Sequence, residues 1–229
     1  MTFDATAPIG AQLITILRDQ IVAGDLTPGT RLSEQDIANS FGMSRQPVRE
    51  AFIKLAAEKL LEIRPQRGTF ICKINLAEVG ASRFVREAVE ADIAKLVAGN
   101  VRPDILADLR AQIKDQYRDI AKGGAQFIRL DERFHRSLAA AAGQEAAWAH
   151  LQPIKMHMDR VRHLTAQELP LDRVIQQHEA IVDAIEAGDE GRAEQAMRQH
   201  LRRVLDDLKT LAAALPDYFE VSPAVNDAQ

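Results

Sequence analysis

The stretch Ser44-Arg45-Gln46-Pro47-Val48-Arg49 decides how the N-terminal third of the chain is interpreted. Serine is a favoured N-cap residue, so Ser44 predicts the start of a helix. Pro47 then falls in the first turn, where its missing N–H costs no hydrogen bond. Arg45 and Arg49 are four residues apart and therefore lie on one face of this helix. The stretch predicts a short helix with two arginines on one face near its N-terminus.

Signals before this stretch complete a helix-turn-helix pattern. A first helix is predicted over residues 10–23, and a second begins after Ser33, an N-cap residue with Asp36 three positions later. Gly42 ends the second helix and separates it from the third by a very short turn. Two short helices joined by a tight glycine turn are the signature of a helix-turn-helix.

Two alternating segments follow the third helix. Residues 61–64 and 69–72 each alternate apolar and polar side chains, as half-buried strands do. Between them, residues 65–68 form a tight and basic turn, Pro-Gln-Arg-Gly. We therefore expect a two-stranded wing, and the whole pattern predicts a winged helix-turn-helix domain over residues 1–75.

A winged helix-turn-helix is expected to bind double-stranded DNA. Its recognition helix enters the major groove, where arginine donates two hydrogen bonds to guanine O6 and N7, and its wing can approach a minor groove or the backbone. The alternative is that Arg45 and Arg49 form an ordinary solvated helix face. The order of capped helices and basic hairpin favours DNA binding. The expected DNA contacts are Arg31, Ser44, Arg45, Gln46, Arg49, Arg67 and Gly68.

Composition and charge limit the class of protein. The 229 residues are 46% hydrophobic and include a single cysteine, which excludes an intramolecular disulfide framework. Residues 1–75 carry nine Lys and Arg against eight Asp and Glu, whereas residues 76–229 carry 20 against 25. DNA binding therefore has to rest on a few placed arginines rather than on bulk positive charge. We find no signal peptide and no membrane-spanning run, and expect a cytoplasmic protein without a membrane partner.

From residue 76 onward the sequence pattern is helical throughout. Helices are predicted near residues 76–98, 103–122, 124–142, 144–164, 171–187 and 189–214. We therefore predict a mainly α protein with three parts. These are the winged helix-turn-helix over residues 1–75, an all-α six-helix antiparallel bundle over residues 76–215, and a tail over residues 216–229.

Four residues of the predicted bundle are candidate metal ligands. Asp131 and His135 are four residues apart, so both side chains lie on one helix face and can chelate one ion. His178 and His200 add two imidazoles from later helices. Such a set suits zinc, nickel or manganese and leaves coordination positions open for the oxygen atoms of a ligand. Taken singly, however, each histidine is more often a surface or core residue than a ligand.

The N-terminal residues resemble bacterial transcription regulators of the GntR type over residues 9–72. The resemblance is carried by residues 28–34, 44–51 and 67–71, which read PGTRLSE, SRQPVREA and RGTFI. It implies DNA contacts at Arg31, Arg45, Arg49 and Gly68. The family usually has Glu-Gly-Leu after the recognition helix, where this chain has Glu58-Lys59-Leu60. Lys59 therefore has to accept the backbone conformation of that glycine, or the turn differs.

The remaining residues resemble the all-helical effector domain of the FadR branch, the FCD domain, in its shorter VanR-like form. The resemblance is carried by residues 86–90, 131–135, 178–185, 188–189 and 197–200. In metal-binding members the matching residues hold the ion, which implies Asp131, His135, His178 and His200 as ligands, with zinc as the first candidate. Arg86 matches an arginine that faces the pocket and could clamp a carboxylate, or it pairs with Glu90 instead. Arg162 is a weaker candidate for binding the ligand.

These features predict a homodimeric transcription regulator, a repressor of a catabolic operon that responds to a small carboxylate effector. Two DNA-binding domains would bind a pseudo-palindromic operator, and the acid, bound at the metal, would shift the dimer between arrangements. An enzyme is not expected, because no convincing general base or nucleophile lies beside the proposed ligands. Three alternatives stay open: a metal-dependent enzyme using the same residues, a metal sensor in which the ion is the effector, and a site that binds nothing.

Overall fold

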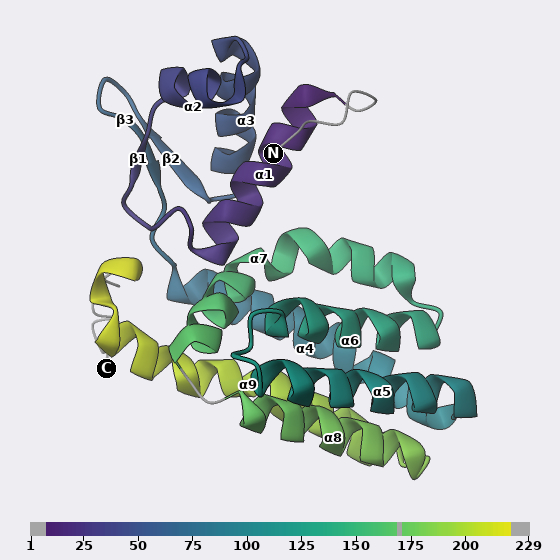
Figure 1. Ribbon diagram of the computed structural model, residues 1–229. Helices are drawn as coiled ribbons and strands as arrows, with labels where there is room; N and C mark the ends of the chain where they lie inside the picture. Colours follow the sequence, from purple (N-terminus) through teal and green to yellow (C-terminus); the bar gives the residue numbers. More distant parts are fainter. Residues whose placement is uncertain (1–7, 169–170, 221–229) are drawn as a thin grey trace, which may run out of the picture. The chain divides into compact units, whose positions relative to one another are not determined.

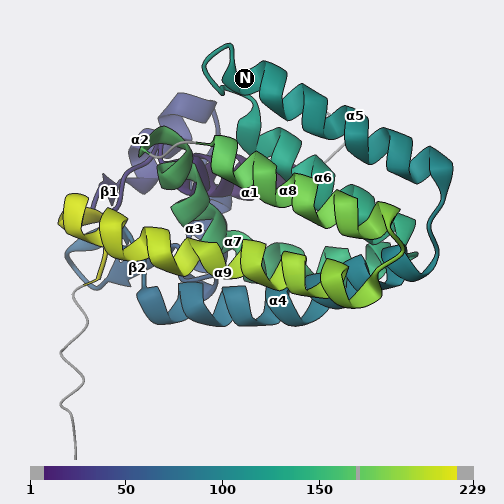
Figure 2. The same ribbon diagram turned by 90° about the horizontal axis from the view of Figure 1, so that it is seen from below.

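The computed structural model describes residues 8–168 and 171–220, which are mainly helical (Figures 1 and 2). The chain divides into two compact units. One unit contains residues up to Leu76 together with those from Ala212 onward, and the other spans Ala77–Leu211. The predicted fold class, a winged helix-turn-helix followed by an all-α domain, is confirmed.

The helices of the first unit are α1 (Ile9–Ala23), α2 (Glu34–Phe41) and α3 (Arg45–Ala57). Helix α1 packs on α3, because each buries an apolar stripe at helical spacing. Ser33 caps α2 as predicted, since its hydroxyl accepts a hydrogen bond from the Asp36 N–H at 3.3 Å. Ser44 occupies the N-cap position of α3, but its side chain makes no capping hydrogen bond. The predicted start of the helix at Ser44 is therefore confirmed, although its hydroxyl does not supply the capping hydrogen bond.

The wing is larger than the sequence predicted. Strands β2 (Leu61–Arg64) and β3 (Gly68–Ile71) form the expected antiparallel hairpin. A third strand, β1 (Arg31–Leu32), pairs with the other edge of β3, so the strand order is β1-β3-β2. With only two residues, β1 is too short to show the alternation that identifies a strand in sequence.

Lys59 adopts a left-handed backbone conformation, which favours glycine. Its φ is +59°, in the left-handed region. The turn is held because the Lys59 N–H donates to Ala56 O at 3.0 Å and the Leu60 N–H donates to Leu55 O at 2.9 Å. A side chain in this region costs roughly 1–2 kcal/mol. The turn that leads from α3 into β2 is therefore kept despite the lysine.

The second unit consists of antiparallel helices close to the predicted ranges. They are α4 (Leu76–Gly99), α5 (Pro103–Ile120), α6 (Phe127–Ala141), α7 (Glu145–Glu168), α8 (Asp172–Glu186) and α9 (Glu190–Ala214). Helix α5 packs on both α6 and α8, and α6 packs on α7. Helices α4 and α9 lie side by side (Figure 2), with Arg198 and Arg202 of α9 donating to Glu87 of α4. Over the described residues, no helix combines the length and apolar character needed to cross a bilayer.

The segment after α9 is described as far as Glu220. Pro216–Tyr218 forms a 3-10 turn, and Phe219 is buried. The Ile74 N–H donates to Tyr218 O at 2.8 Å, and the Glu220 N–H donates to Ile74 O at 3.0 Å. The predicted tail therefore includes a short parallel bridge at its start. Residues 221–229 lie outside the described part of the chain.

Candidate functional site

Two arginines of α3, Arg45 and Arg49, point to one carboxylate. The Arg45 Nη2 donates to Glu34 Oε2 at 2.8 Å, and the Arg49 Nε donates to Glu34 Oε1 at 3.2 Å. These hydrogen bonds, that of Arg45 first, hold the pKa of Glu34 below its ordinary value. The arginine side chains are 58% and 60% exposed. The face of α3 that is predicted to contact DNA is therefore held by Glu34 of α2. This residue was not predicted from the sequence.

Arg31 and Gly68 lie together at the wing. Gly68 has a φ of +111°, and a Cβ built there would lie 2.6 Å from the Arg31 Nε. A larger residue would collide with this guanidinium, so the glycine leaves room for it. Ser44, Gln46 and Arg67, the other predicted DNA contacts, are exposed. All seven predicted contacts belong to the first unit and are available to a ligand, with Gly68 half-buried.

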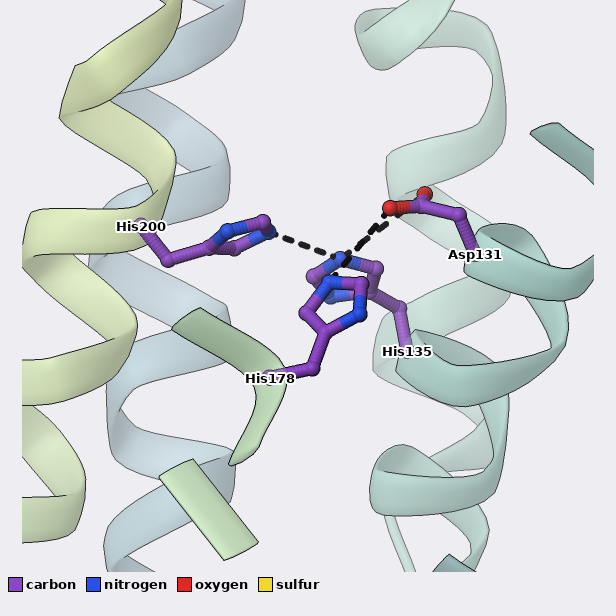
Figure 3. A group of neighbouring side chains, drawn as sticks. All are labelled: Asp131, His135, His178 and His200. Carbon is purple, nitrogen blue, oxygen red and sulfur yellow. Dashed lines mark hydrogen bonds and ion pairs between the residues drawn. The ribbon is translucent and has the colours of Figure 1, made fainter. Parts of the chain in front are cut away.

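The four predicted metal ligands come together in the second unit (Figure 3). Asp131 and His135 extend from α6, His178 from α8 and His200 from α9. One potential ligand atom from each lies within 4.8 Å of all the others. The His135 and His200 Nε2 atoms are 3.2 Å apart, and the His178 Nε2 lies 3.4 Å from Asp131 Oδ1. Three of these residues are buried, and His200 is half-buried.

Each histidine has an oxygen acceptor at its outer nitrogen. The Nδ1 atom of His178 lies 2.9 Å from Gln116 Oε1, and that of His200 lies 2.9 Å from Gln177 Oε1. The Nδ1 atom of His135 lies 2.6 Å from Glu90 Oε2. An acceptor at this position places the proton on Nδ1 and leaves the Nε2 lone pair facing the centre.

This arrangement fits a bound cation. With their protons on Nδ1, His135 and His200 direct two lone pairs at each other across 3.2 Å, next to the Asp131 carboxylate. Burial lowers the pKa of His178 and His200 well below the ordinary value, with nearby positive charge adding to it, so both are neutral at pH 7. Neutral imidazole is the form that binds metal. A cation between these atoms would relieve the repulsion of the lone pairs.

Arg86 is fully buried, and it makes the ion pair with Glu90 that the sequence left open as the alternative to clamping a carboxylate ligand. It pairs with Glu90, since the Nε donates to Oε1 at 2.5 Å and the Nη2 donates to Oε2 at 3.2 Å. It also lines the cavity beside the histidine cluster. Burial alone raises the pKa of Glu90, but the charge of Arg86 and the hydrogen-bonding contacts of His135 and Arg86 outweigh it and hold the pKa far below its ordinary value. Glu90 therefore links the cavity arginine to a metal-ligand candidate.

A small cavity adjoins the four candidate ligands. Its polar lining includes Arg86, Asp131, Arg162, Thr165, Gln177 and His200, and its apolar lining includes Phe127, Ile128, Met158, Leu171 and Val174. Arg162 contacts the Asp131 carboxylate and donates to Asp159 Oδ1 at 3.0 Å. Burial, with the nearby charge of Arg86, lowers the pKa of Arg162 to about 9, so it stays charged at pH 7. The cavity of about 60 Å³ holds roughly four to six water-sized groups.

The sequence of this chain matches two known protein families. Residues 10–71 match the bacterial regulatory proteins of the gntR family, and residues 83–203 match the FCD domain. The chain belongs to the GntR family. The HTH-type transcriptional repressor RspR of Escherichia coli (strain K12) is 35% identical over 216 residues, which cover 93% of this chain and 95% of that protein.

Other relatives and solved structures agree with this membership. The "Probable D-xylose utilization operon transcriptional repressor" of Paenarthrobacter nicotinovorans is 30% identical over 86% of this GntR-family chain and 87% of its own length. The structure of E. coli McbR/YncC superimposes with a TM-score of 0.73 at 20% identity, covering 89% of this chain and 98% of that one. At this identity the structural match supports the fold alone. The matching families and relatives are transcription regulators, so the expectation that this GntR-family protein is not an enzyme is confirmed.

The buried ion pair between Arg86 and Glu90 of this GntR-family protein predicts a large loss of stability when it is broken. Replacing Glu90 by Leu leaves the Arg86 guanidinium buried without its carboxylate, so we expect unfolding free energy to fall by about 3–5 kcal/mol. Urea unfolding followed by circular dichroism measures it. The control is Glu194→Leu, which breaks a partly exposed pair with Arg198 and should cost far less, because water screens such pairs. Equal losses in the two variants would contradict the prediction.

Proposed function

We propose that this protein is a homodimeric transcriptional repressor whose operator binding is controlled by a small carboxylate bound at a metal ion in the FCD domain. The observation that carries the proposal is the convergence of Asp131 and three histidines, each histidine with an outer oxygen acceptor. Repression is proposed because RspR, which is similar over 93% of this chain, is named a repressor. A protein that binds the bacterial chromosome would act in the cytoplasm.

Asp131, His135, His178 and His200 would hold a divalent ion, zinc first, with nickel or manganese compatible with the same ligand set. Four protein ligands leave space for further oxygen ligands on an ion that expands its coordination. The ion would supply a Lewis-acid site for one carboxylate oxygen. Glu90, Gln116 and Gln177 would orient the imidazoles, since their oxygens lie within 2.9 Å of the Nδ1 atoms.

The cavity lining supports a small organic acid as the effector. Two guanidinium groups, Arg86 and Arg162, face the same space as the metal-ligand candidates. Guanidinium N–H groups form charge-assisted hydrogen bonds to carboxylate. Because the Nε and Nη2 of Arg86 already bind Glu90, its Nη1 is the group that would meet the acid. The apolar lining would cover the carbon skeleton of the acid, and the cavity of about 60 Å³ limits that skeleton to roughly four to six groups. Arg86 and Arg162 would therefore position the acid against the ion.

Removing one imidazole tests the metal site. We expect the purified protein to contain about one divalent ion per chain and His178→Ala to lose it. The control, His150→Ala, removes an exposed histidine outside the cluster and should keep the ion. Elemental analysis measures the content. Equal and negligible metal in wild type and His178→Ala would end the metal proposal, and operator release on chelation without acid would favour a metal sensor instead.

The proposed DNA contacts are the seven residues of the recognition helix and the wing. Arg49 is the sharpest test, because it is exposed and lies on the face that would enter the major groove. We expect Arg49→Ala to lose about 1–3 kcal/mol of specific binding. Fluorescence anisotropy would use a duplex that the wild-type protein selects from a random pool. Arg118→Ala, an exposed arginine of α5, is the control. Unchanged affinity in Arg49→Ala would overturn the assignment.

The homodimer proposal rests on the exposed face of α4. Phe84 is 66% exposed and Leu96 is 52% exposed. Ala77, Ala81 and Ala88 are exposed on the same face at helical spacing. A large apolar face with small residues beside it is the kind of surface that one helix buries against another. A second copy of this chain would cover it through a two-fold contact, in which the same face serves both subunits.

A charge on this face should break the dimer. Phe84→Glu would place a carboxylate in an apolar contact, and we expect the dimer dissociation constant to rise by about tenfold or more. Sedimentation equilibrium measures it. Val101→Glu alters another exposed apolar residue, one outside α4, and should leave association unchanged. A Phe84→Glu variant that associates like wild type would place the interface elsewhere.

A further inference from the structure

Glu34 is a residue of the DNA-binding unit to which the proposed function gives no role. It is the first residue of α2, and its side chain is 23% exposed. Its two carboxylate oxygens accept hydrogen bonds from two different arginines of α3, Arg45 and Arg49. One carboxylate is thus shared by the two side chains proposed to read bases.

The atoms used in these bonds leave the arginines able to bind DNA. Arg49 donates to Glu34 through Nε at 3.2 Å. The terminal nitrogens, Nη1 and Nη2, are not used for Glu34, and a terminal edge can fork onto guanine O6 and N7. Arg45 donates through one terminal nitrogen, Nη2, at 2.8 Å. Arg49 can therefore bind a guanine while it keeps its bond to Glu34.

Phosphate and guanine differ in how they compete with Glu34. A phosphate bound at the free terminal nitrogens of Arg49 would bring a second negative charge close to the Glu34 carboxylate, and the two would repel each other. A guanine edge in the major groove is uncharged and can be reached with the Nε bond intact. Glu34 therefore opposes contacts to phosphates more than contacts to guanine.

We propose that Glu34 is a positioning residue that sets DNA specificity by holding Arg45 and Arg49 for base edges and withholding them from phosphates. This inference rests on the proposed function, because it takes the two arginines as base-reading residues. The low net charge of residues 1–75, with nine basic and eight acidic residues, fits it. A DNA-binding domain with so little excess charge gains selectivity when its few arginines are kept away from the DNA phosphates, which are the same in every sequence.

The experiment compares two variants that lose the same charge from the same helical turn. Glu34→Gln keeps the shape of the side chain but removes its charge. Asp36→Asn removes a charge two residues away, at an exposed residue for which the described structure records no ion pair with either arginine. Affinities are measured by anisotropy at several salt concentrations. The two probes are the duplex selected by the wild-type protein from a random pool and a scrambled duplex of equal length and composition.

Both variants should bind every duplex somewhat more tightly, because each removes one negative charge near the DNA. Only Glu34→Gln should also reduce the ratio of selected to scrambled affinity, by about fivefold, the order expected when two exposed ion pairs are lost. Selection from the random pool should show weakened guanine preference for Glu34→Gln alone. A thermal unfolding midpoint equal to that of the wild-type protein shows that the Glu34→Gln variant is folded.

An equal ratio in wild type, Glu34→Gln and Asp36→Asn would overturn the role of Glu34. The Arg49→Ala variant separates this failure from that of the proposed function. If Arg49→Ala loses operator binding while Glu34→Gln keeps the wild-type ratio, only the role of Glu34 is wrong. If Arg49→Ala binds the selected duplex as wild type does, the reading face is wrong and the inference about Glu34 falls with it.

Discussion

The buried contact between Glu90, Arg86 and His135 constrains the rest of the FCD domain. A carboxylate and a guanidinium inside a helical bundle lose their hydration, and only close pairing offsets that loss. Glu90 meets this requirement by accepting two hydrogen bonds from Arg86 and by facing the Nδ1 of His135 at 2.6 Å. The contact between Glu90 of α4 and His135 of α6 holds these two helices against each other. One ionic contact therefore sets the position of a cavity arginine and of a candidate ligand.

The imidazoles of His178 and His200 are also held by contacts between helices, but their partners are neutral glutamine side chains. His178 on α8 meets Gln116 on α5, and these two helices pack against each other. His200 on α9 meets Gln177 on α8. Each outer contact crosses between two helices, so a shift of one helix along its neighbour would separate the imidazole from its acceptor. The bundle thus fixes the direction of the inner nitrogens by the same packing that buries its core.

The helices were predictable from local periodicity, and Asp131 and His135 from their spacing of one helical turn. His178 and His200 were candidates as imidazoles of later helices, and the resemblance assigned all four residues to one site. The outer acceptors Gln116 and Gln177 were not predictable, since a glutamine on a helix shows no pattern until another helix packs on it. Strand β1 was missed because two residues cannot alternate, and the bridge at Phe219 because its partner, Ile74, is far away in sequence. The features that the sequence alone could not predict are contacts between residues far apart in the chain.

Two glutamates of this protein each hold a pair of basic side chains, and their surroundings separate their roles. Glu90 is buried with Arg86 and His135, so exchange of its partners would expose charges to an apolar interior. Glu34 binds Arg45 and Arg49 at the surface, where water screens the pairs and each exchange is cheap. The buried carboxylate therefore fixes geometry, whereas the exposed one holds its arginines and still lets them turn toward another group. A DNA-binding surface needs this second kind of contact, because Arg49 has to reach a base edge while its Nε stays bound to Glu34.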